Sequence, residues 1–461
     1  MADLIVDNPF TLETACTVRL AGEADVSRVL DNAKSAARAF RTSSLEERIA
    51  LSESACAKME ERADEIAHDI SKMMGKPLSQ AKGEVKGMAF RWRHMNGIAK
   101  ESLADIQLPP KEGFERRIVK EPMGVIFDLP AWNYPLLTAV NAVAPAILAG
   151  NAVIVKHSPR SPLCGEHFER AFKEAGAPPN LVQSLHCDHP TSEKIVGDMR
   201  VDHVLFTGSV FGGHRIQRAA ADRFLHVGLE LGGNDPAYVA ADSDVQKAAE
   251  SLVDGAMYNA GQSCCAVERV YVHASLYEKF LQAAEAIVKA YVLGDPLADT
   301  TSMGPIAQPH HIAELEHFVG DATSKGAKLL VGGKKQSVGG QGRFFQPTLL
   351  RDVTHAMDLF KKESFGPILP VSVVSSDDEA LQKMNDSQLG LTAAIYTTDR
   401  ERAARMARSL EAGTVFMNRC DALDPALPWC GVKDTGRGVT LSSLGFDYLT
   451  RPKAIHFKLT L

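Results

Sequence analysis

The stretch that decides the fold is residues 124–155, which read GVIFDLPAWNYPLLTAVNAVAPAILAGNAVIV. It opens with the short apolar run Val125-Ile126-Phe127 and closes with a second such run at residues 152–155. Between the two, residues 136–148 have helical spacing and end just before Gly150. Short runs rich in β-branched residues, separated by a helix, are typical of a strand–helix–strand unit. We therefore expect parallel strands here, connected by a helix.

The same alternation continues along most of the chain. Residues 24–97 read as helices, and the glycine-rich residues 332–342 read as a surface loop. The further segments expected to be strands are 184–186, 204–206, 237–239, 270–272, 329–331, 369–374, 393–396 and 414–417, and those expected to be helices are 164–175, 254–260 and 276–291. This pattern predicts an α/β chain of two lobes, with a boundary near Gly232-Gly233.

Composition excludes several classes of protein. A length of 461 residues allows two or three domains, and 51 Lys and Arg against 57 Asp and Glu give a net charge of −6. No basic field is present to attract nucleic acid or an anionic membrane surface. The apolar stretch at residues 136–155 is interrupted by Asn141, Pro145 and Gly150, so we expect no membrane span.

The cysteines and the first residues suggest a cellular location. Eight cysteines without a CxxC pair argue against a disulfide scaffold, a zinc ribbon and a thioredoxin-like redox motif. Residues 1–10 lack the basic-then-apolar order of a signal peptide. The expectation is a cytoplasmic enzyme with reduced thiols.

Two segments carry candidate catalytic residues. Cys264 stands among small polar residues at the end of an expected helix, where a cysteine can act as an exposed nucleophile. Glu230 lies 34 residues upstream, at the end of an apolar run, where burial would raise its pKa towards that of a general base. Taken alone, each has another interpretation, because cysteines are often buried small hydrophobes and a glutamate here can cap a turn.

Two further segments offer hydrogen-bond donors. Asn133 lies in a turn bounded by Pro130 and Pro135, from which its amide can stabilise an oxyanion or, alternatively, cap a helix. Residues 206–209, Phe-Thr-Gly-Ser, end an expected strand and open a helix, whose first backbone N–H groups can bind phosphate. A GxGxxG dinucleotide fingerprint is absent from the sequence.

The order of these segments resembles that of the aldehyde dehydrogenase superfamily, and the resemblance covers nearly the whole chain. The run Lys156-His157-Ser158-Pro159 is most similar to that of short bacterial succinate-semialdehyde-type dehydrogenases. The matching segments are residues 130–135, 153–156, 206–209, 230–233, 261–264, 363–367, Asn418 and 431–438.

The resemblance implies a two-lobed fold. Residues 1–104 and 123–232 would form a Rossmann-like cofactor-binding domain, and residues 233–444 an α/β catalytic domain. Residues 105–122 and 445–461 would form a small β oligomerisation element. The closing strand would then pack against a partner subunit in a homodimer or homotetramer.

The resemblance also implies a mechanism without a metal. Cys264 would attack the aldehyde carbon, while the Asn133 amide and the Cys264 backbone N–H hold the oxyanion. After hydride transfer, Glu230 would activate the water that hydrolyses the thioester. Cys265 is expected to contribute only to packing.

The implied cofactor is NAD or NADP. By resemblance, Lys156 and Glu363 match contacts to the ribose hydroxyls. The other residues assigned to the cofactor are Trp132, Ser158, Arg160, Gly208, Ser209 and Phe365. Pro159 stands where NAD-preferring members carry a glutamate, so a carboxylate that would repel a 2′-phosphate is missing. We therefore expect NADP to be accepted as well as NAD, or preferred.

The aldehyde itself is not fixed by the sequence. A semialdehyde such as succinate semialdehyde would need a basic partner for its carboxylate, and the candidates are Arg91, Arg93 and Arg419. The two arginines near residue 92 would equally suit an exposed basic helix face. Trp92 and Trp429 would instead line a pocket for uncharged aromatic or aliphatic aldehydes.

Two rival functions use the same residues. A non-redox thioester hydrolase or acyl-transferring enzyme would employ Cys264 without net redox chemistry, but family members that transfer to coenzyme A usually lack a glutamate at the position of Glu230. A non-catalytic binding protein is disfavoured because Cys264, Glu230, Asn133 and Lys156 occur together.

Overall fold

A six-stranded sheet lies at the centre of the first lobe, as seen in the computed structural model, which describes residues 2–460. Five strands are parallel, and the sixth, β21, pairs antiparallel with β9. In spatial order the strands are β21 (Gly436–Arg437), β9 (His226–Glu230), β8 (His203–Thr207), β5 (Val125–Leu129), β6 (Ala152–Val155) and β7 (Val182–Ser184).

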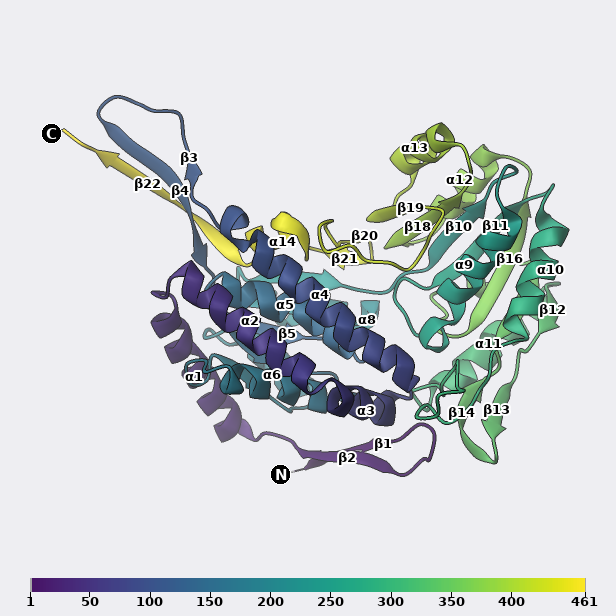
Figure 1. Cartoon of the computed structure of the whole chain (residues 1–461), viewed down its shortest axis with the longest axis horizontal. Helices are drawn as coiled ribbons and strands as arrows, with labels where there is room; N and C mark the ends of the chain where they lie inside the picture. The colour runs from purple at the N-terminus through teal and green to yellow at the C-terminus, as the bar shows by residue number, and fades with distance from the viewer. Residues whose placement is uncertain (1, 461) are drawn as a thin grey trace.

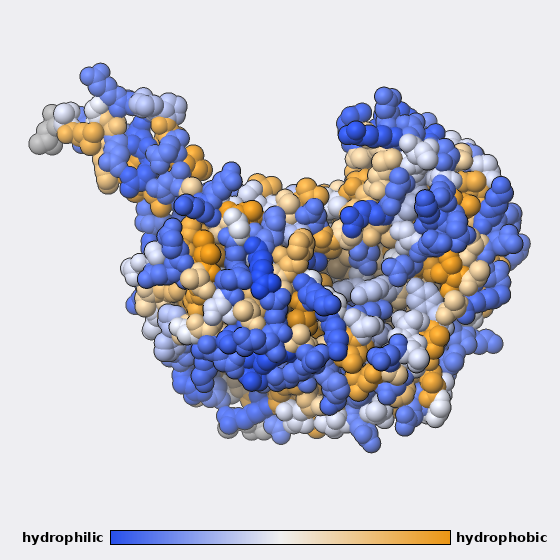
Figure 2. Space-filling view, in the orientation of Figure 1, coloured by the Kyte–Doolittle hydropathy of each residue, from blue (hydrophilic) through white to orange (hydrophobic). Residues whose placement is uncertain are grey.

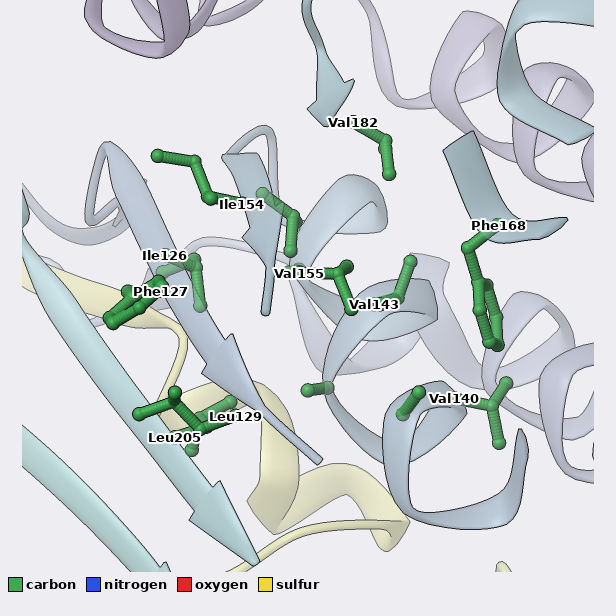
Figure 3. Close-up of a cluster of buried hydrophobic side chains, with 14 of the residues drawn as sticks. Ile126, Phe127, Leu129, Val140, Val143, Ile154, Val155, Phe168, Val182 and Leu205 are labelled. Carbon is green, nitrogen blue, oxygen red and sulfur yellow. The ribbon is translucent and has the colours of Figure 1, made fainter. Parts of the chain in front are cut away.

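Helices cover this sheet and supply its core (Figure 1). Figure 3 shows Ile126, Ile154 and Val143, from two strands and the helix between them, together with Phe168 from α6. Strands buried on both faces read as continuous apolar runs, which is why residues 124–155 identified the sheet. The helices are α1 (Glu23–Phe40), α2 (Leu45–Glu61), α3 (Ala63–Met74), α4 (Leu78–Ser102), α5 (Pro135–Leu148), α6 (Leu163–Glu174), α7 (His189–Gly197) and α8 (Val210–Ala219).

A sharp turn separates α3 from α4 and places Lys76 inside the lobe. Gly75 ends α3 with a φ of +81°, and Pro77 precedes the first residue of α4. A side chain at Gly75 would meet Pro9 and Pro305, so glycine is the residue that fits this left-handed position. The turn thereby fixes the position of Lys76 between the two helices.

The second lobe contains a seven-stranded sheet in which only β12 and β15 are antiparallel. Its order is β12 (Lys328–Val331), β15 (Thr348–Arg351), β16 (Ile368–Val374), β11 (Val267–His273), β10 (Asp235–Val239), β18 (Thr392–Tyr396) and β19 (Thr414–Met417). The helices beside it are α9 (Val245–Met257), α10 (Tyr277–Val288), α11 (His311–Ser324), α12 (Asp377–Asn385) and α13 (Arg400–Ser409), with a short 3₁₀ turn at Asp358–Phe360. The chain passes from the first sheet to the second between β9 and β10.

A three-stranded arm projects from the first lobe (Figure 1). It consists of β3 (Ile106–Gln107), β4 (Phe114–Pro122) and β22 (Thr450–Lys458), and α14 (Ser442–Asp447) precedes its last strand. The antiparallel register of β22 on β4 runs from Thr450 opposite Pro122 to Lys458 opposite Phe114. The arm exposes apolar side chains, among them Ile106, Leu108, Phe457 and Leu459. Apolar, orange patches are visible on the arm in Figure 2. Two segments that are distant in the sequence thus form one β element.

Three two-stranded sheets were not expected from the sequence. The predicted loop at residues 332–342 was wrong, because it contains most of the hairpin β13 (Lys335–Val338) and β14 (Gln341–Phe345). Gly339 and Gly340, at φ +60° and +82°, form the two-residue turn that such a hairpin requires. The others are an N-terminal hairpin, β1 (Asp3–Asp7) with β2 (Thr14–Arg19), and the short pair β17 (Leu389–Gly390) with β20 (Val432–Lys433).

Several predicted boundaries also moved, two of them near the site or in the first sheet. The helix expected at residues 254–260 is α9, which ends earlier, at Met257, and is followed by a 3₁₀ turn at Tyr258–Gly261. The strand expected at 184–186 is β7, which lies two residues earlier. No helix within residues 2–460 is long and apolar enough to span a membrane.

Candidate active site

Two cavities between the lobes meet at Cys264, which lines both. Figure 2 shows that the surface between the lobes is hollowed. The larger cavity, of about 790 Å³, is lined by residues at the carboxyl ends of β5, β6 and β8 and by Glu363 and Phe365 of the second lobe. The smaller, of about 320 Å³, lies between α4, α5, α9 and the segment 420–429. Besides Cys264, both cavities share only Thr207 and Leu231 among their lining residues.

A strained turn presents Cys264 at this junction. Asn259 and Ala260 have φ values of +53° and +56°, and Gly261 follows at +70°. A Cβ on Gly261 would lie 2.1 Å from the carbonyl oxygen of Gly366, so no larger residue fits there. Backbone strain of this kind persists where surrounding contacts fix the geometry, as they do at many functional sites.

The two neighbouring cysteines have different surroundings. Cys264 is partly exposed to the cavities, whereas Cys265 is buried. The thiol of Cys265 donates to Asp421 Oδ1 at 2.8 Å. A hydrogen bond with Cys264, together with burial, raises the pKa of Cys265 well above that of a free thiol. Only Cys264 therefore has the access that a nucleophile needs.

Asn133 is held by both its backbone and its side chain. Its side chain is buried, and its Nδ2 donates to the carbonyl oxygen of Gln262 at 3.2 Å. Because an amide nitrogen carries two hydrogens, one N–H remains for a group in the cavity that Asn133 lines. Tyr134, and not Asn133, is the residue preceding α5, and no side chain caps this helix. The alternative interpretation of Asn133 as a helix cap is therefore wrong.

Glu230 ends β9 and lines the smaller cavity. Burial raises the pKa of Glu230 to about 7. Two groups oppose that rise: the hydroxyl of Thr440, which donates to Oε1, and the nearby charge of Arg91. A carboxyl group with this pKa exchanges protons readily near neutral pH.

The larger cavity gathers the residues assigned to the cofactor. Lys156 directly follows β6 and is almost fully buried, and burial lowers its pKa. Ser209 caps α8 through its Oγ, which accepts from the Gly212 N–H at 3.1 Å. The rings of Trp132 and Phe365 meet edge to face with centroids 5.7 Å apart. The residues predicted for the cofactor that line this cavity are Trp132, Lys156, Ser158, Arg160, Gly208, Ser209, Glu363 and Phe365.

Arg160 has a partner that sequence reasoning missed. Its guanidinium donates to a carboxylate oxygen and to the backbone carbonyl of Asp7, in the N-terminal hairpin. Asp7 also accepts from Arg343 of the second lobe. Although burial raises the pKa of Asp7, the hydrogen bonds from both arginines lower it below its usual value. Nothing in the sequence pattern around Asp7 indicated this long-range contact.

Arg91 is the only one of the three candidate arginines that reaches the smaller cavity. Its side chain is 9% exposed and donates to Asn141 Oδ1 at 3.2 Å and to the Leu137 carbonyl oxygen at 3.4 Å. Among residues 2–460, no carboxylate lies within ion-pair distance of it. Trp429 lines the same cavity.

Three other substrate candidates were wrong. Arg93 is exposed and pairs with Glu53 and Glu60. Trp92 is fully buried, its ring stacked on Phe168 and Phe172. Successive residues of a helix point about 100° apart, so only one of positions 91–93 can face a given cavity. Arg419 is exposed and lines neither cavity.

Several residues of the smaller cavity had not been singled out. Gln80 and Glu84 lie on the same face of α4 as Arg91, which was already a candidate from the sequence, and this spacing of four and seven residues was a readable signal. Asp421 lies in the smaller cavity beside Cys265, and only the fold brings these two residues together. Burial raises the pKa of Asp421 to about 6.

The fold and the two joined cavities define a two-lobed α/β enzyme, and comparisons with known proteins identify its family. A model described as the aldehyde dehydrogenase family matches residues 2–455. An aldehyde dehydrogenase of Paenarthrobacter nicotinovorans is 36% identical over 94% of each chain. The succinate semialdehyde dehydrogenase [NAD(P)+] Sad of Escherichia coli (strain K12) is 33% identical over 95% of this chain and 94% of that protein.

Solved structures agree. The betaine aldehyde dehydrogenase of Staphylococcus aureus in complex with NAD+ superposes with a TM-score of 0.95 at 29% identity, over 100% of this chain and 92% of that one. A 3,6-anhydro-L-galactose dehydrogenase in complex with NAP has a TM-score of 0.94 at 31% identity, over 99% and 96%. The chain belongs to the aldehyde dehydrogenase family. The predicted family, fold class and enzyme class are confirmed.

Proposed function

We propose that this chain oxidises an aldehyde that carries a distal carboxylate to the corresponding acid, using NAD or NADP and a covalent intermediate on Cys264. The observation that carries the proposal is the position of Cys264, exposed where a dinucleotide-sized cavity meets a small one. A nucleophile at that junction touches both the substrate and the hydride acceptor.

The larger cavity fits a dinucleotide. Lys156 is a buried cation that lines the cavity, and among residues 2–460 its ammonium group has no hydrogen-bond partner. The first N–H groups of α8, next to Gly208 and Ser209, suit a pyrophosphate. Glu363 offers a carboxylate to a ribose hydroxyl from the opposite lobe. When bound, the nicotinamide accepts a hydride.

The first covalent step uses Cys264 and Asn133. The thiolate of Cys264 adds to the aldehyde carbon, and the carbonyl oxygen becomes an oxyanion. The free N–H of the Asn133 amide and the backbone N–H of Cys264 then donate to that oxyanion. Gln262 orients this amide through its carbonyl oxygen. Loss of the hydride leaves a thioester on Cys264.

Glu230 serves the second step. It accepts a proton from the water that attacks the thioester carbon, and the bond from that carbon to the Cys264 sulfur breaks. The carboxylic acid leaves and the thiolate of Cys264 is restored. The pKa of about 7 lets Glu230 take up this proton at neutral pH and release it to solvent afterwards. This base also argues against the rival acyl-transfer function.

Arg91 supports a substrate with a carboxylate at its far end. A buried guanidinium without a carboxylate partner is costly to desolvate, and a substrate carboxylate would offset that cost. Relatives at 33–34% identity include succinate-semialdehyde dehydrogenases. A second candidate is an uncharged aromatic aldehyde, because the rings of Tyr134, Tyr258 and Trp429 line the same cavity.

A panel of aldehydes tests the proposal by absorbance at 340 nm, without coenzyme A. Arg91→Gln should lower kcat/KM for succinate semialdehyde about 10- to 150-fold, the equivalent of ~1.5–3 kcal/mol, and spare benzaldehyde. Arg93→Gln is the matched control, since Arg93 lies on the exposed face of the same helix. A higher kcat/KM for benzaldehyde in the unchanged enzyme would overturn the semialdehyde assignment. Absence of any cofactor reduction would favour the non-redox hydrolase.

The surroundings of Pro159 support use of both cofactors. Position 159, three residues after Lys156, carries no carboxylate. The negative charge of Asp7 is outweighed by the positive charges of its two partners, Arg160 and Arg343. The cluster beside the cavity therefore carries a net charge of +1. Such a field favours a 2′-phosphate without excluding NAD.

We further propose that the arm joins subunits into a homodimer or homotetramer. Its exposed apolar side chains, among them Ile106 and Phe457, lie on a projecting β element with a free edge. The cytoplasm is the location that the eight unpaired cysteines favour, because its thiols are kept reduced.

A further inference from the structure

Lys76 and Glu84 form a buried ion pair that the mechanism above does not use. Their side chains are 0% and 2% exposed, and the ammonium group donates to Glu84 Oε2. Lys76 lies in the turn before α4, and Glu84 lies on the second turn of that helix. Burying two charges is costly, and well-packed apolar residues in their place are often neutral or stabilising. Stability alone therefore does not explain the pair.

The contacts of Lys76 point to the segment that carries Asn133. Its ammonium nitrogen donates to the Asn133 carbonyl oxygen at 2.8 Å and lies 4.0 Å from the centre of the Tyr134 ring. Both contacts fix the peptide unit that joins these two residues. The direction in which the Asn133 side chain leaves the backbone is thereby fixed as well.

Glu84 holds the other end of the same segment. Its Oε1 accepts from the backbone N–H groups of Leu136 at 2.8 Å and Leu137 at 3.4 Å. These are N–H groups of the first turn of α5, which have no partner within the helix. The ion pair therefore holds the segment 133–137 at both ends, Lys76 at its first residue and Glu84 at its last two.

A second set of bonds ties this segment to the cysteine loop. Asn259 donates through Nδ2 to the carbonyl oxygens of both Asn133 and Gln262, each at 3.1 Å. Gln262 O also accepts from the Asn133 amide. Two groups, Lys76 Nζ and Asn259 Nδ2, thus donate to the carbonyl oxygen of Asn133. Together they fix the position of Asn133 relative to Cys264, which lies two residues after Gln262.

We propose that Lys76 and Glu84 are positioning residues that align the Asn133 amide with the oxyanion formed at Cys264. The inference rests on the proposed role of Asn133. Oxyanion stabilisation depends on donors held in place before the reaction, so a small displacement lowers the rate without abolishing binding. Neither residue needs to touch the oxyanion for this effect.

The test is a mutant cycle in the full-length protein. Lys76→Met with Glu84→Gln removes the charges and keeps side-chain length and the Glu84 acceptor oxygen. We expect kcat to fall about 10- to 100-fold, while the dissociation constant for NAD, measured by quenching of protein fluorescence, stays unchanged. In an Asn133→Ala background the same two changes should lower kcat less than twofold further, because the group that they position is gone.

Controls separate this proposal from the proposed function. Ser52→Ala removes a buried hydroxyl that is bonded to Trp92 and Asn96 and lines neither cavity, and it should leave kcat unchanged. If Asn133→Ala keeps full activity, the oxyanion role itself is wrong. If Asn133→Ala loses activity but the double variant does not, only the positioning role is wrong. Should the double variant not fold, Glu84→Gln alone must lower kcat at an unchanged dissociation constant for NAD, and an unchanged kcat overturns the proposal.

Discussion

Replacing Thr440 by valine should move the pH dependence of thioester hydrolysis. Thr440 donates its hydroxyl to Glu230 Oε1, and this bond stabilises the ionised carboxylate. Valine has the same shape, and the backbone bonds of Thr440 to Trp429 remain possible. The substitution therefore removes one hydrogen bond and leaves burial, the cause of the raised pKa of Glu230, in place.

The expected shift follows from the strength of that bond. A hydrogen bond to a charged group contributes about 1.5–3 kcal/mol, and one pKa unit corresponds to about 1.4 kcal/mol. The pKa of Glu230, about 7 in the present structure, should thus rise by about one unit or more. With a shift of one unit, the ionised fraction at pH 7 falls from roughly half to roughly a tenth, and hydrolysis slows about fivefold. At pH 9 both proteins are almost fully ionised.

The assay is the steady-state rate that follows the first burst of reduced cofactor, measured between pH 5.5 and 9.5. The acid limb of Thr440→Val should lie about one pH unit higher, with nearly equal rates at pH 9. Thr440→Ser keeps the hydroxyl and should leave the limb in place. An equal loss of rate at all pH values would mean that Thr440 acts only structurally, and an unshifted profile would refute the assignment of the limb to Glu230.

Three further predictions concern the cysteines, the cofactor and the arm. Cys264→Ala should abolish oxidation and retain cofactor binding in a fluorescence titration, whereas Cys265→Ala should keep most activity, and the reverse result would move the nucleophile by one residue. Pro159→Glu should shift the ratio of kcat/KM values towards NAD about 5- to 150-fold, the equivalent of ~1–3 kcal/mol of repulsion, and strict NAD dependence of the unchanged enzyme would contradict the reasoning. Deleting the chain after Leu449 should yield monomers in sedimentation velocity, and an unchanged assembly would exclude the arm as the interface.

The residues that the sequence predicted best are those that lie at the ends of strands. Lys156, Glu230 and Gly208 each follow or end an apolar run, and such runs are readable because parallel strands are buried on both faces. Ligands of α/β sheets bind at the carboxyl ends of the strands, so the predicted strands also pointed to the candidate site. The resemblance then supplied a role for each residue.

The sequence predicted poorly the features that depend on the rotation of a helix about its axis or on contacts between distant segments. Residues 91–93 differ by only one position each, yet one faces the cavity, one the core and one the solvent. Without the exact rotation of α4, the three could not be distinguished. Asp7 reaches Arg160 across 153 residues of chain through a hairpin whose short strands carry little periodic signal. Both features contribute to selectivity in the proposals above, for the aldehyde and for the cofactor.

Because Arg91 lies near Glu230, the charge of the substrate should affect the pKa of Glu230. Its charge lowers the pKa of Glu230, so the base is sensitive to whatever neutralises that charge. A thioester with a carboxylate on Arg91 would cancel this field and bring a like charge towards Glu230, and both effects raise the pKa of Glu230. An uncharged thioester would do neither. The acid limb of hydrolysis should therefore lie at higher pH for succinate semialdehyde than for benzaldehyde in the same enzyme, and the difference should vanish in Arg91→Gln. Coincident limbs in the unchanged enzyme would mean that the substrate carboxylate is held elsewhere.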